Sequence, residues 1–276
     1  MAIVAALQMN SVVDVNQNLA TVDKYLSQLS LSEPLLLVLP ECFACFGGSD
    51  KDLLRVAEQR QTGVIQQNIA ALAKKYAVWI VAGTVPIKVE DEQRYSASTL
   101  IFDDQGQVIS EYQKIHLFDV EVNDNTRSYH ESKYTRAGQN VVVFDSPFGR
   151  VGVAVCFDLR FPALFQAMGK VDVVVLPSAF TYVTGEAHWH ALLKARSIEL
   201  QSYLVAANQT GTHANGRQTY GHSQILSPWG EMLAEKTTEE GLILSTIDLD
   251  YVKSIRQKMP LNPFHFKHTQ PSISKE

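Results

Sequence analysis

The chain is poor in cysteine, in long apolar runs and in clustered positive charge. Its 276 residues include three cysteines, Cys42, Cys45 and Cys156, too few for a disulfide framework and typical of a reducing compartment. No stretch approaches the roughly 18 consecutive apolar residues of a membrane-spanning helix, and the first residues lack the positive segment of a signal peptide. The net charge of −5, without a basic run, disfavours nucleic-acid binding. We therefore expect a cytoplasmic protein, with neither membrane nor nucleic acid among its partners.

The composition is otherwise that of a packed globular protein. Apolar residues make up 46% of the chain, enough to build a core that needs no stabilising metal ion or disulfide bond. No low-complexity linker and no Pro/Gly-rich boundary divides the sequence. We predict one domain over residues 1–260, followed by a polar, proline-interrupted tail over residues 261–276.

Short apolar runs alternate with helical patterns along the chain. Strands are predicted at 3–7, 35–39, 78–82, 171–176 and 203–207, and helices at 16–29, 64–76 and 188–200. Hairpins are predicted to join 98–102 to 108–112, 141–144 to 151–155, and 223–226 to 231–234. Strands joined partly by hairpins and partly by helices predict an α/β fold, with two packed mixed sheets and helices outside them.

Three predicted strands are each followed by one chemically reactive side chain. Glu41 follows the run at 35–39, Lys114 follows 108–112, and Cys156 follows 151–155. Taken singly, each has an ordinary explanation: a solvated loop carboxylate, a surface lysine or a small buried cysteine. Together they suit covalent catalysis, because a thiol needs a base to become a nucleophile. No metal or cofactor is required by this chemistry.

The residues around these three resemble the signature blocks of the nitrilase (carbon–nitrogen hydrolase) superfamily. The blocks are LPECF at 39–43, YQKIHLFDV at 112–120 and GVAVCFDLRFP at 152–162, in the family order. Three further blocks agree, namely LPSAFT at 176–181, TGEAHW at 184–189 and YGHS at 220–223. The similarity extends to about residue 260.

The resemblance implies a role for each residue. Glu41 would be the general base, Lys114 the electrostatic stabiliser and Cys156 the nucleophile, with the backbone N–H of Phe157 as a second oxyanion donor. The family also has a second glutamate bonded to the lysine. Glu131 is its candidate, although an exposed loop carboxylate is the alternative. The family fold, an α-β-β-α sandwich that dimerises, implies a homodimer.

Within the superfamily, the blocks from 176 onwards resemble the Nit-type amidases. These include ω-amidases, which act on α-ketoglutaramate and α-ketosuccinamate, and a sister group that acts on deaminated glutathione. The segments 176–180 and 218–221 favour the sister group, whose products would be 2-oxoglutarate and Cys-Gly. An α-keto acid substrate calls for a nearby cation, so Arg160 is placed at the substrate together with Phe157, Phe180 and Thr181. A structural ion pair between Arg160 and Asp158, or another acid, is the alternative.

Other interpretations of the sequence predict different chemistry. The Cys42/Cys45 pair forms a C-x-x-C motif that suits redox or zinc chemistry, although buried or pocket-wall cysteines fit the surrounding pattern better. An acyltransferase that transfers the acyl group to an amine, or a binding protein without turnover, would keep the same blocks. Four histidines show no recognisable metal-ligand pattern: His188, His190, His213 and His222.

Overall fold

The computed structural model of the chain describes residues 2–30, 33–90, 92–124 and 126–261. Its helices are α1 (Val15–Ser27), α2 (Asp50–Arg55), α3 (Val64–Tyr76), α4 (Pro162–Ala167), α5 (Tyr182–Leu200) and α6 (Leu249–Lys258), with 3₁₀ helices η1 (Glu131–Lys133) and η2 (Cys156–Arg160). Within the described ranges, no helix combines the length and apolarity needed to cross a membrane. Apart from residue 261, the predicted tail lies outside the described residues.

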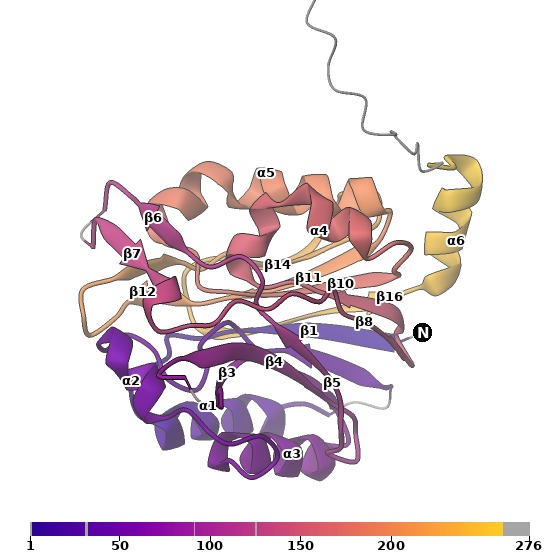
Figure 1. Cartoon of the computed structure of the whole chain (residues 1–276). Coiled ribbons are helices and arrows are strands. Elements are labelled where there is room, and N and C mark those ends of the chain that lie inside the picture. The colour runs from indigo at the N-terminus through magenta and orange to yellow at the C-terminus, as the bar shows by residue number, and fades with distance from the viewer. Residues whose placement is uncertain (1, 31–32, 91, 125, 262–276) are drawn as a thin grey trace, which may run out of the picture.

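Two six-stranded mixed sheets lie face to face (Figure 1). The first runs in the order β16 (Gly241–Ile247), β1 (Ala2–Gln8), β2 (Leu35–Val38), β3 (Trp79–Lys88), β4 (Tyr95–Phe102) and β5 (Val108–Gln113). The second runs in the order β15 (Met232–Lys236), β14 (Ser223–Leu226), β11 (Tyr203–Asn208), β10 (Val173–Ser178), β9 (Gly149–Val153) and β8 (Val143–Ser146). Helices α1 and α3 cover the outer face of the first sheet, and α4 and α5 cover that of the second. The predicted α-β-β-α sandwich is confirmed.

Both faces of the inner strands of the first sheet are buried, and the nearly all-apolar composition of β1 and β2 shows this. In β1, Val4 and Ala6 belong to the core between the sheets, whereas Ala5 and Leu7 belong to the core beneath α1 and α3. Side chains alternate between the two faces of a strand, so both alternating sets must be apolar. The all-apolar runs that predicted strands therefore also account for the two layers of core.

Two predicted boundaries are wrong near the site. Helix α5 begins at Tyr182, six residues before the predicted start at His188, because most side chains of its first turns are exposed and show no apolar period. Trp189, predicted near the start of the helix, lies well inside it and is fully buried. Strand β9 ends at Val153, so Cys156 belongs to η2 and not to the strand end.

Several short elements were not predicted. Two small hairpins, β6 (Asp119–Glu121) with β7 (Ser128–His130) and β12 (Thr210–Thr212) with β13 (Gln218–Tyr220), lie at one end of the sandwich (Figure 1). Strand β16 pairs antiparallel with the whole of β1, which joins the two ends of the described chain in one sheet. Helices α2, α4 and α6 were also missed.

A close backbone approach brings the loop after β2 against β3. Gly83 has a φ of +34°, at a register shift in β3, and a Cβ at this position would lie 2.0 Å from the carbonyl oxygen of Pro40. Only glycine leaves room for that approach. The position of Glu41, the next residue after Pro40, depends on this contact.

Candidate active site

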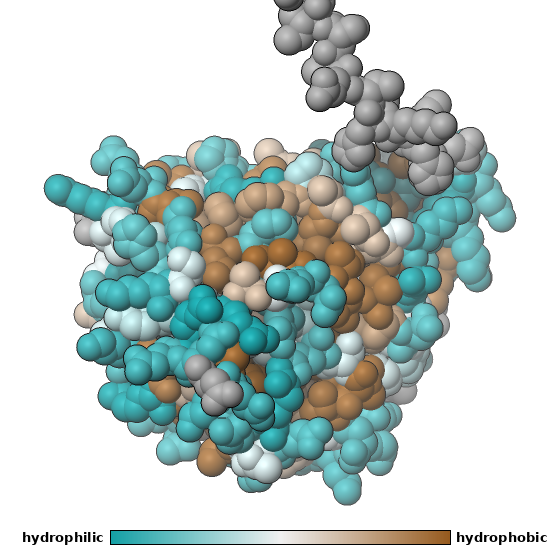
Figure 2. All heavy atoms as spheres, in the orientation of Figure 1, coloured by the Kyte–Doolittle hydropathy of each residue, from teal (hydrophilic) through white to brown (hydrophobic). Residues whose placement is uncertain are grey.

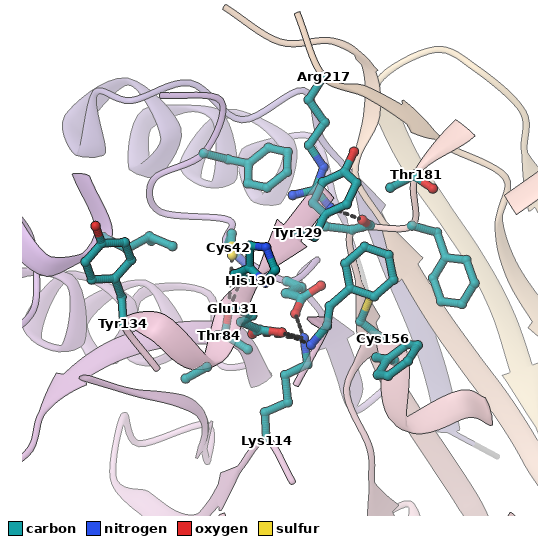
Figure 3. Close-up of a pocket in the computed structure, with 18 of the residues that line it drawn as sticks. Cys42, Thr84, Lys114, Tyr129, His130, Glu131, Tyr134, Cys156, Thr181 and Arg217 are labelled. Atoms are coloured by element: carbon teal, nitrogen blue, oxygen red, sulfur yellow. Dashed lines mark hydrogen bonds and ion pairs between the residues drawn. The ribbon is translucent and has the colours of Figure 1, made fainter. Parts of the chain in front are cut away.

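A cavity of about 260 Å³ is lined by all four candidate catalytic residues (Figure 3). Glu41 lies in the loop after β2, and Lys114 follows β5 directly. Glu131 is the first residue of η1, and Cys156 is the first residue of η2. The structure thus gathers four side chains that are far apart in the sequence into one pocket.

Lys114 lies between the two glutamates. Its Nζ atom is 2.7 Å from Oε1 of Glu41, and 3.0 Å and 2.8 Å from the two carboxylate oxygens of Glu131. Burial alone would lower the pKa of Lys114, but the charges of Glu131 and Glu41 outweigh it and hold that pKa well above its ordinary value. The lysine is therefore a fixed positive charge at the bottom of the cavity.

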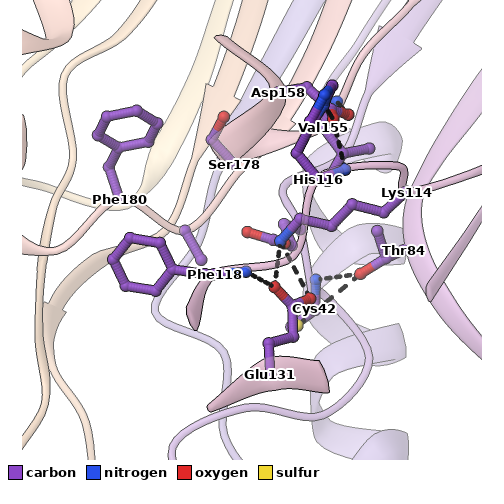
Figure 4. Close-up of polar contacts among 12 residues, drawn as sticks. Cys42, Thr84, Lys114, His116, Phe118, Glu131, Val155, Asp158, Ser178 and Phe180 are labelled. Carbon is purple, nitrogen blue, oxygen red and sulfur yellow. Dashed lines mark hydrogen bonds and ion pairs between the residues drawn. The ribbon is translucent and has the colours of Figure 1, made fainter. Parts of the chain in front are cut away.

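Glu131 is anchored by two contacts that keep it facing the lysine. Besides binding Lys114, its Oε2 atom accepts a hydrogen bond of 2.6 Å from the backbone N–H of Phe118 (Figure 4). Burial raises the pKa of Glu131, while Lys114 lowers it and Glu41 raises it. These contacts differ from those of a solvated loop carboxylate, which was the alternative interpretation of this residue.

The thiol of Cys156 is buried beside this charged group. Burial raises its pKa well above the ordinary value, and the negative charge of Glu41 raises it further, whereas Lys114 and the backbone of Ala179 lower it. The resting group is consequently the neutral thiol. It needs a base to become a nucleophile, and Glu41 is the carboxylate whose charge acts on it most strongly.

The backbone at Cys156 is held in an unusual conformation by Asp158. Cys156 has a φ of +47°, in the left-handed region that costs a non-glycine residue about 1 kcal/mol. The carboxylate of Asp158 accepts hydrogen bonds from the N–H of Val155 at 2.9 Å and from the hydroxyl of Tyr112 at 2.6 Å. It also contacts the backbone N–H and Nδ1 of His116, at 3.0 Å and 2.7 Å. This network fixes the turn that presents the thiol (Figure 4).

The four predicted substrate residues all line the cavity: Phe157, Arg160, Phe180 and Thr181. The guanidinium of Arg160 lies over the rings of Phe157 and Phe180, 5.9 Å and 5.4 Å from their centroids. Its Nη1 atom is 3.2 Å from Nδ1 of His188. The alternative ion pair with Asp158 is wrong, since in the described chain Arg160 makes no salt bridge with any acid.

Sequence reasoning missed most of a second wall of the cavity, formed by Phe46, Thr84, Tyr129 and Arg217. Cys42, expected as a buried or pocket-wall cysteine, also lines this wall, and its backbone N–H donates to the hydroxyl of Thr84 at 2.8 Å. These residues come from four separate segments, and none of them stands out in a strand or helix pattern. Only Arg217 carried a usable signal, as a lone charge just before the YGHS block.

The C-x-x-C motif does not form a reactive pair. Cys42 and Cys45 are both free thiols, and Cys45 is buried. Burial raises the pKa of Cys42 far above its ordinary range and that of Cys45 to about 11, so both stay protonated at neutral pH.

Two of the histidines do approach metal-ligand geometry, contrary to expectation. One ligand atom each of His190, His222 and Glu235 lies within 4.8 Å of the others, outside the cavity. Hydrogen bonds already engage these groups: Nδ1 of His222 is 2.9 Å from Oε1 of Glu235, and Gln224 contacts both His190 and Glu235, at 2.6 Å and 3.0 Å. The contacts account for the cluster as a polar network.

His213 supports the second wall and should make stability depend on pH. Its buried ring contacts Phe46 edge-on, and Nε2 is 2.8 Å from the hydroxyl of Thr219. Burial lowers the pKa of His213 to about 4, against about 6.5 in the unfolded chain. Keeping His213 neutral therefore costs the folded state nothing above pH 6.5. The loss in unfolding free energy grows as the pH falls and reaches its full value below pH 4. We expect this residue alone to cost about 2 kcal/mol of unfolding free energy between pH 7.5 and pH 5.

Urea unfolding of the wild type and of His213→Gln at both pH values checks this contribution. Groups other than His213 titrate equally in both proteins, so the wild type should lose about 2 kcal/mol more than the variant. Equal losses in the two proteins would show that the imidazole is protonated in the folded state as easily as in the unfolded state.

Comparison with known proteins agrees with the fold and the site. The family model described as carbon–nitrogen hydrolase matches residues 3–257. The chain is 38% identical over 261 residues to the deaminated glutathione amidase of Yersinia enterocolitica, covering 94% of this chain and 91% of that one. It is 39% identical over 237 residues to the deaminated glutathione amidase of Dictyostelium discoideum, covering 82% and 80%.

A solved structure shares the architecture. The chain superposes on the crystal structure of the C. elegans NitFhit protein with a TM-score of 0.85 and 34% identity, covering 98% of this chain and 66% of that one. The chain belongs to the carbon–nitrogen hydrolase family of the nitrilase superfamily.

Proposed function

We propose that the chain hydrolyses a small-molecule amide by covalent catalysis at Cys156, within a single domain over residues 1–260. The observation that carries this proposal is the buried lysine held between two carboxylates beside a protonated thiol. Glu41 can accept a proton and later return it, Lys114 can only supply positive charge, and Glu131 keeps the lysine charged and oriented. Each residue thus suits one step of acyl transfer.

The reaction has two halves. Glu41 takes the proton from the thiol of Cys156 as the sulfur attacks the amide carbonyl, and Lys114 and the N–H of Phe157 stabilise the oxyanion. The C–N bond breaks, Glu41 protonates the departing amine, and a thioester remains. Glu41 then removes a proton from water, which attacks the thioester, and the acid leaves as the thiol is restored.

The substrate best supported is deaminated glutathione, which would give 2-oxoglutarate and Cys-Gly. Two curated relatives near 38% identity carry that activity in their names, and Arg160 supplies a cation without an acidic partner in the described chain. We place the α-keto acid end of the substrate against Arg160, with Thr181 and Phe180 beside it. ω-Amidase activity on α-ketoglutaramate is the alternative, because that substrate has the same acyl end.

A panel of substrates tests the proposal. We expect kcat/KM for deaminated glutathione to exceed that for α-ketoglutaramate by at least about tenfold, with no cleavage of simple nitriles or N-carbamoyl amino acids. The measurement is release of 2-oxoglutarate, or of ammonia for the nitriles and carbamoyl compounds. A preference for α-ketoglutaramate would favour the ω-amidase, and cleavage of nitriles without any amide would rule out the proposed branch.

A homodimer and a cytoplasmic location stay predictions. Figure 2 shows apolar side chains gathered over α4 and beside α5, and Tyr182, Val183 and Ile198 of α5 are 43%, 42% and 39% exposed. Association would cover such a surface. Light scattering at micromolar concentration is expected to give twice the mass of the chain, and a monomer would contradict the dimer.

A further inference from the structure

A second cation, Arg217, faces the cavity from the wall opposite Lys114 (Figure 3). Arg217 immediately precedes β13, and its guanidinium lies 4.9 Å from the ring centroids of both Phe46 and Tyr129. Its Nη2 atom donates to the carbonyl oxygen of Ala179 at 3.0 Å. The side chain is therefore held in one place by two aromatic rings and one hydrogen bond.

The hydrogen bonding of Arg217 is incomplete. A guanidinium is always charged and carries five N–H donors. Nε of Arg217 is buried and lacks an acceptor within the ranges that the structure describes, and none of the salt bridges found there involves this arginine. The carboxylate of Asp124 is already engaged by the hydroxyl of Tyr129 at 2.8 Å and by the N–H groups of Thr126 and Arg127. A fixed, partly desolvated cation with a free donor is a site for an anion.

Ala179 connects this anion site to the nucleophile. Its C=O accepts a hydrogen bond from Arg217, and its backbone lowers the pKa of the Cys156 thiol, so this one residue of the cavity lining neighbours both groups. Arg217 also lines a smaller adjoining depression with Thr126, Tyr182 and Gln218, among others. A substrate bound at Cys156 can thus extend past Arg217 towards the outside.

The two arginines occupy different walls. Arg160 stacks on Phe180 and on Phe157, the residue that directly follows Cys156. Arg217 stacks on Phe46 and Tyr129 and borders the outer depression. In the proposed reaction the acyl group stays on the sulfur while the amine departs, so the inner cation suits the acyl portion and the outer cation suits the amine portion.

We propose that Arg217 binds a carboxylate on the amine portion of the substrate, so that the preferred amide carries one negative group on each side of the scissile bond. This inference rests on the proposed amidase function and deepens it. A primary amide, which releases ammonia, has nothing for Arg217 to bind. A dipeptide leaving group ends in a carboxylate, and Arg217 can accept it with its planar fork.

The test uses matched substrates. The 2-oxoglutarate amide of Cys-Gly and the same compound with a C-terminal carboxamide differ only in the charge that Arg217 would bind. We expect Arg217→Met to lower the ratio of kcat/KM for the carboxylate over the carboxamide at least about tenfold, mainly through KM. Arg217→Lys should recover part of the ratio, because it restores charge without the fork. Arg150→Met, which removes an exposed arginine of β9, is the matched control and should leave the ratio unchanged.

A binding measurement separates this inference from the catalytic proposal. In Cys156→Ala protein, calorimetric affinity for the carboxylate compound should fall at least about tenfold when Arg217→Met is added, and affinity for the carboxamide should not. Equal losses of affinity for both compounds, or no loss for either, would overturn the role of Arg217 even if the wild type is an active amidase.

If the wild type cleaves no amide, the proposed function fails, and the calorimetric comparison still decides whether Arg217 binds the carboxylate. Cleavage of primary amides alone, with no binding of the dipeptide amide, would refute the inference and leave amidase activity in place.

Discussion

Replacing Cys156 by alanine is expected to lower kcat/KM for the amide substrate by at least about 10⁴-fold while the fold is retained. No other group in the cavity can form the thioester, because the thiol of Cys42 is held protonated by burial and by the charge of Glu41. The cavity and its charged residues would still bind substrate, so the loss should be in kcat. Steady-state hydrolysis of deaminated glutathione, with circular dichroism as the check on folding, measures it.

Cys45→Ala is the matched control for that variant. Cys45 is buried, does not line the cavity, and has a pKa raised to about 11, so its removal should change kcat/KM by less than about threefold. The pair of variants also tests the redox interpretation of the C-x-x-C motif. If Cys156→Ala kept full activity while Cys45→Ala lost it, the covalent mechanism would be wrong.

The layered fold could be predicted because the inner strands of both sheets are buried. Runs such as 35–39 and 203–207 are apolar at every position, and such runs indicate strands that are covered on both faces. The first turns of α5 and strand β16 were missed for the opposite reason. Their side chains are partly exposed, so packing against distant segments and not local pattern determines their structure.

The core of the candidate site was predicted from motifs, whereas its walls were not. Glu41, Lys114 and Cys156 each follow an apolar run, and family resemblance located Glu131. Contacts within the site depend on the backbone conformation of loops, which the residue pattern does not predict. Two examples are the N–H of Phe118, which anchors Glu131, and the C=O of Ala179, which accepts a hydrogen bond from Arg217. Their roles follow from tertiary position and have no residue-type signal.

Asp158 illustrates a prediction that failed for a physical reason. Its proximity to Arg160 in the sequence suggested an ion pair, but the turn of η2 directs the carboxylate inward. There it binds the N–H of Val155 and the hydroxyl of Tyr112 and is fully buried. A buried carboxylate takes the donors that surround it. Arg160 is consequently left without an acidic partner in the described chain, which is what makes it available to a substrate.

Replacing Lys114 by methionine is expected to cost both activity and stability. The ammonium is nearly inaccessible, at 2% exposure, and it pairs with Glu41 and Glu131, whose side chains are 7% and 20% exposed. Removing it leaves two buried carboxylates facing each other without a counter-charge, which should lower the free energy of unfolding by about 3–5 kcal/mol. Activity should fall at least about 10³-fold, because the oxyanion loses its positive partner.

Two measurements show whether uncompensated charge causes the destabilisation of Lys114→Met: the pH dependence of its stability and the stability of a triple variant without the three charges. Without Lys114, the pKa of Glu131, already raised by burial, should rise further. The loss of unfolding free energy caused by the unpaired carboxylates is therefore full above that pKa, and it shrinks as the pH falls and the carboxylate binds a proton. Urea unfolding at pH 7.5 and pH 5 should therefore show a smaller difference from wild type at pH 5. Adding Glu41→Gln and Glu131→Gln to Lys114→Met should restore most of the stability and none of the activity. If the triple variant is no more stable than Lys114→Met, lost packing of the lysine chain, and not uncompensated charge, causes the destabilisation.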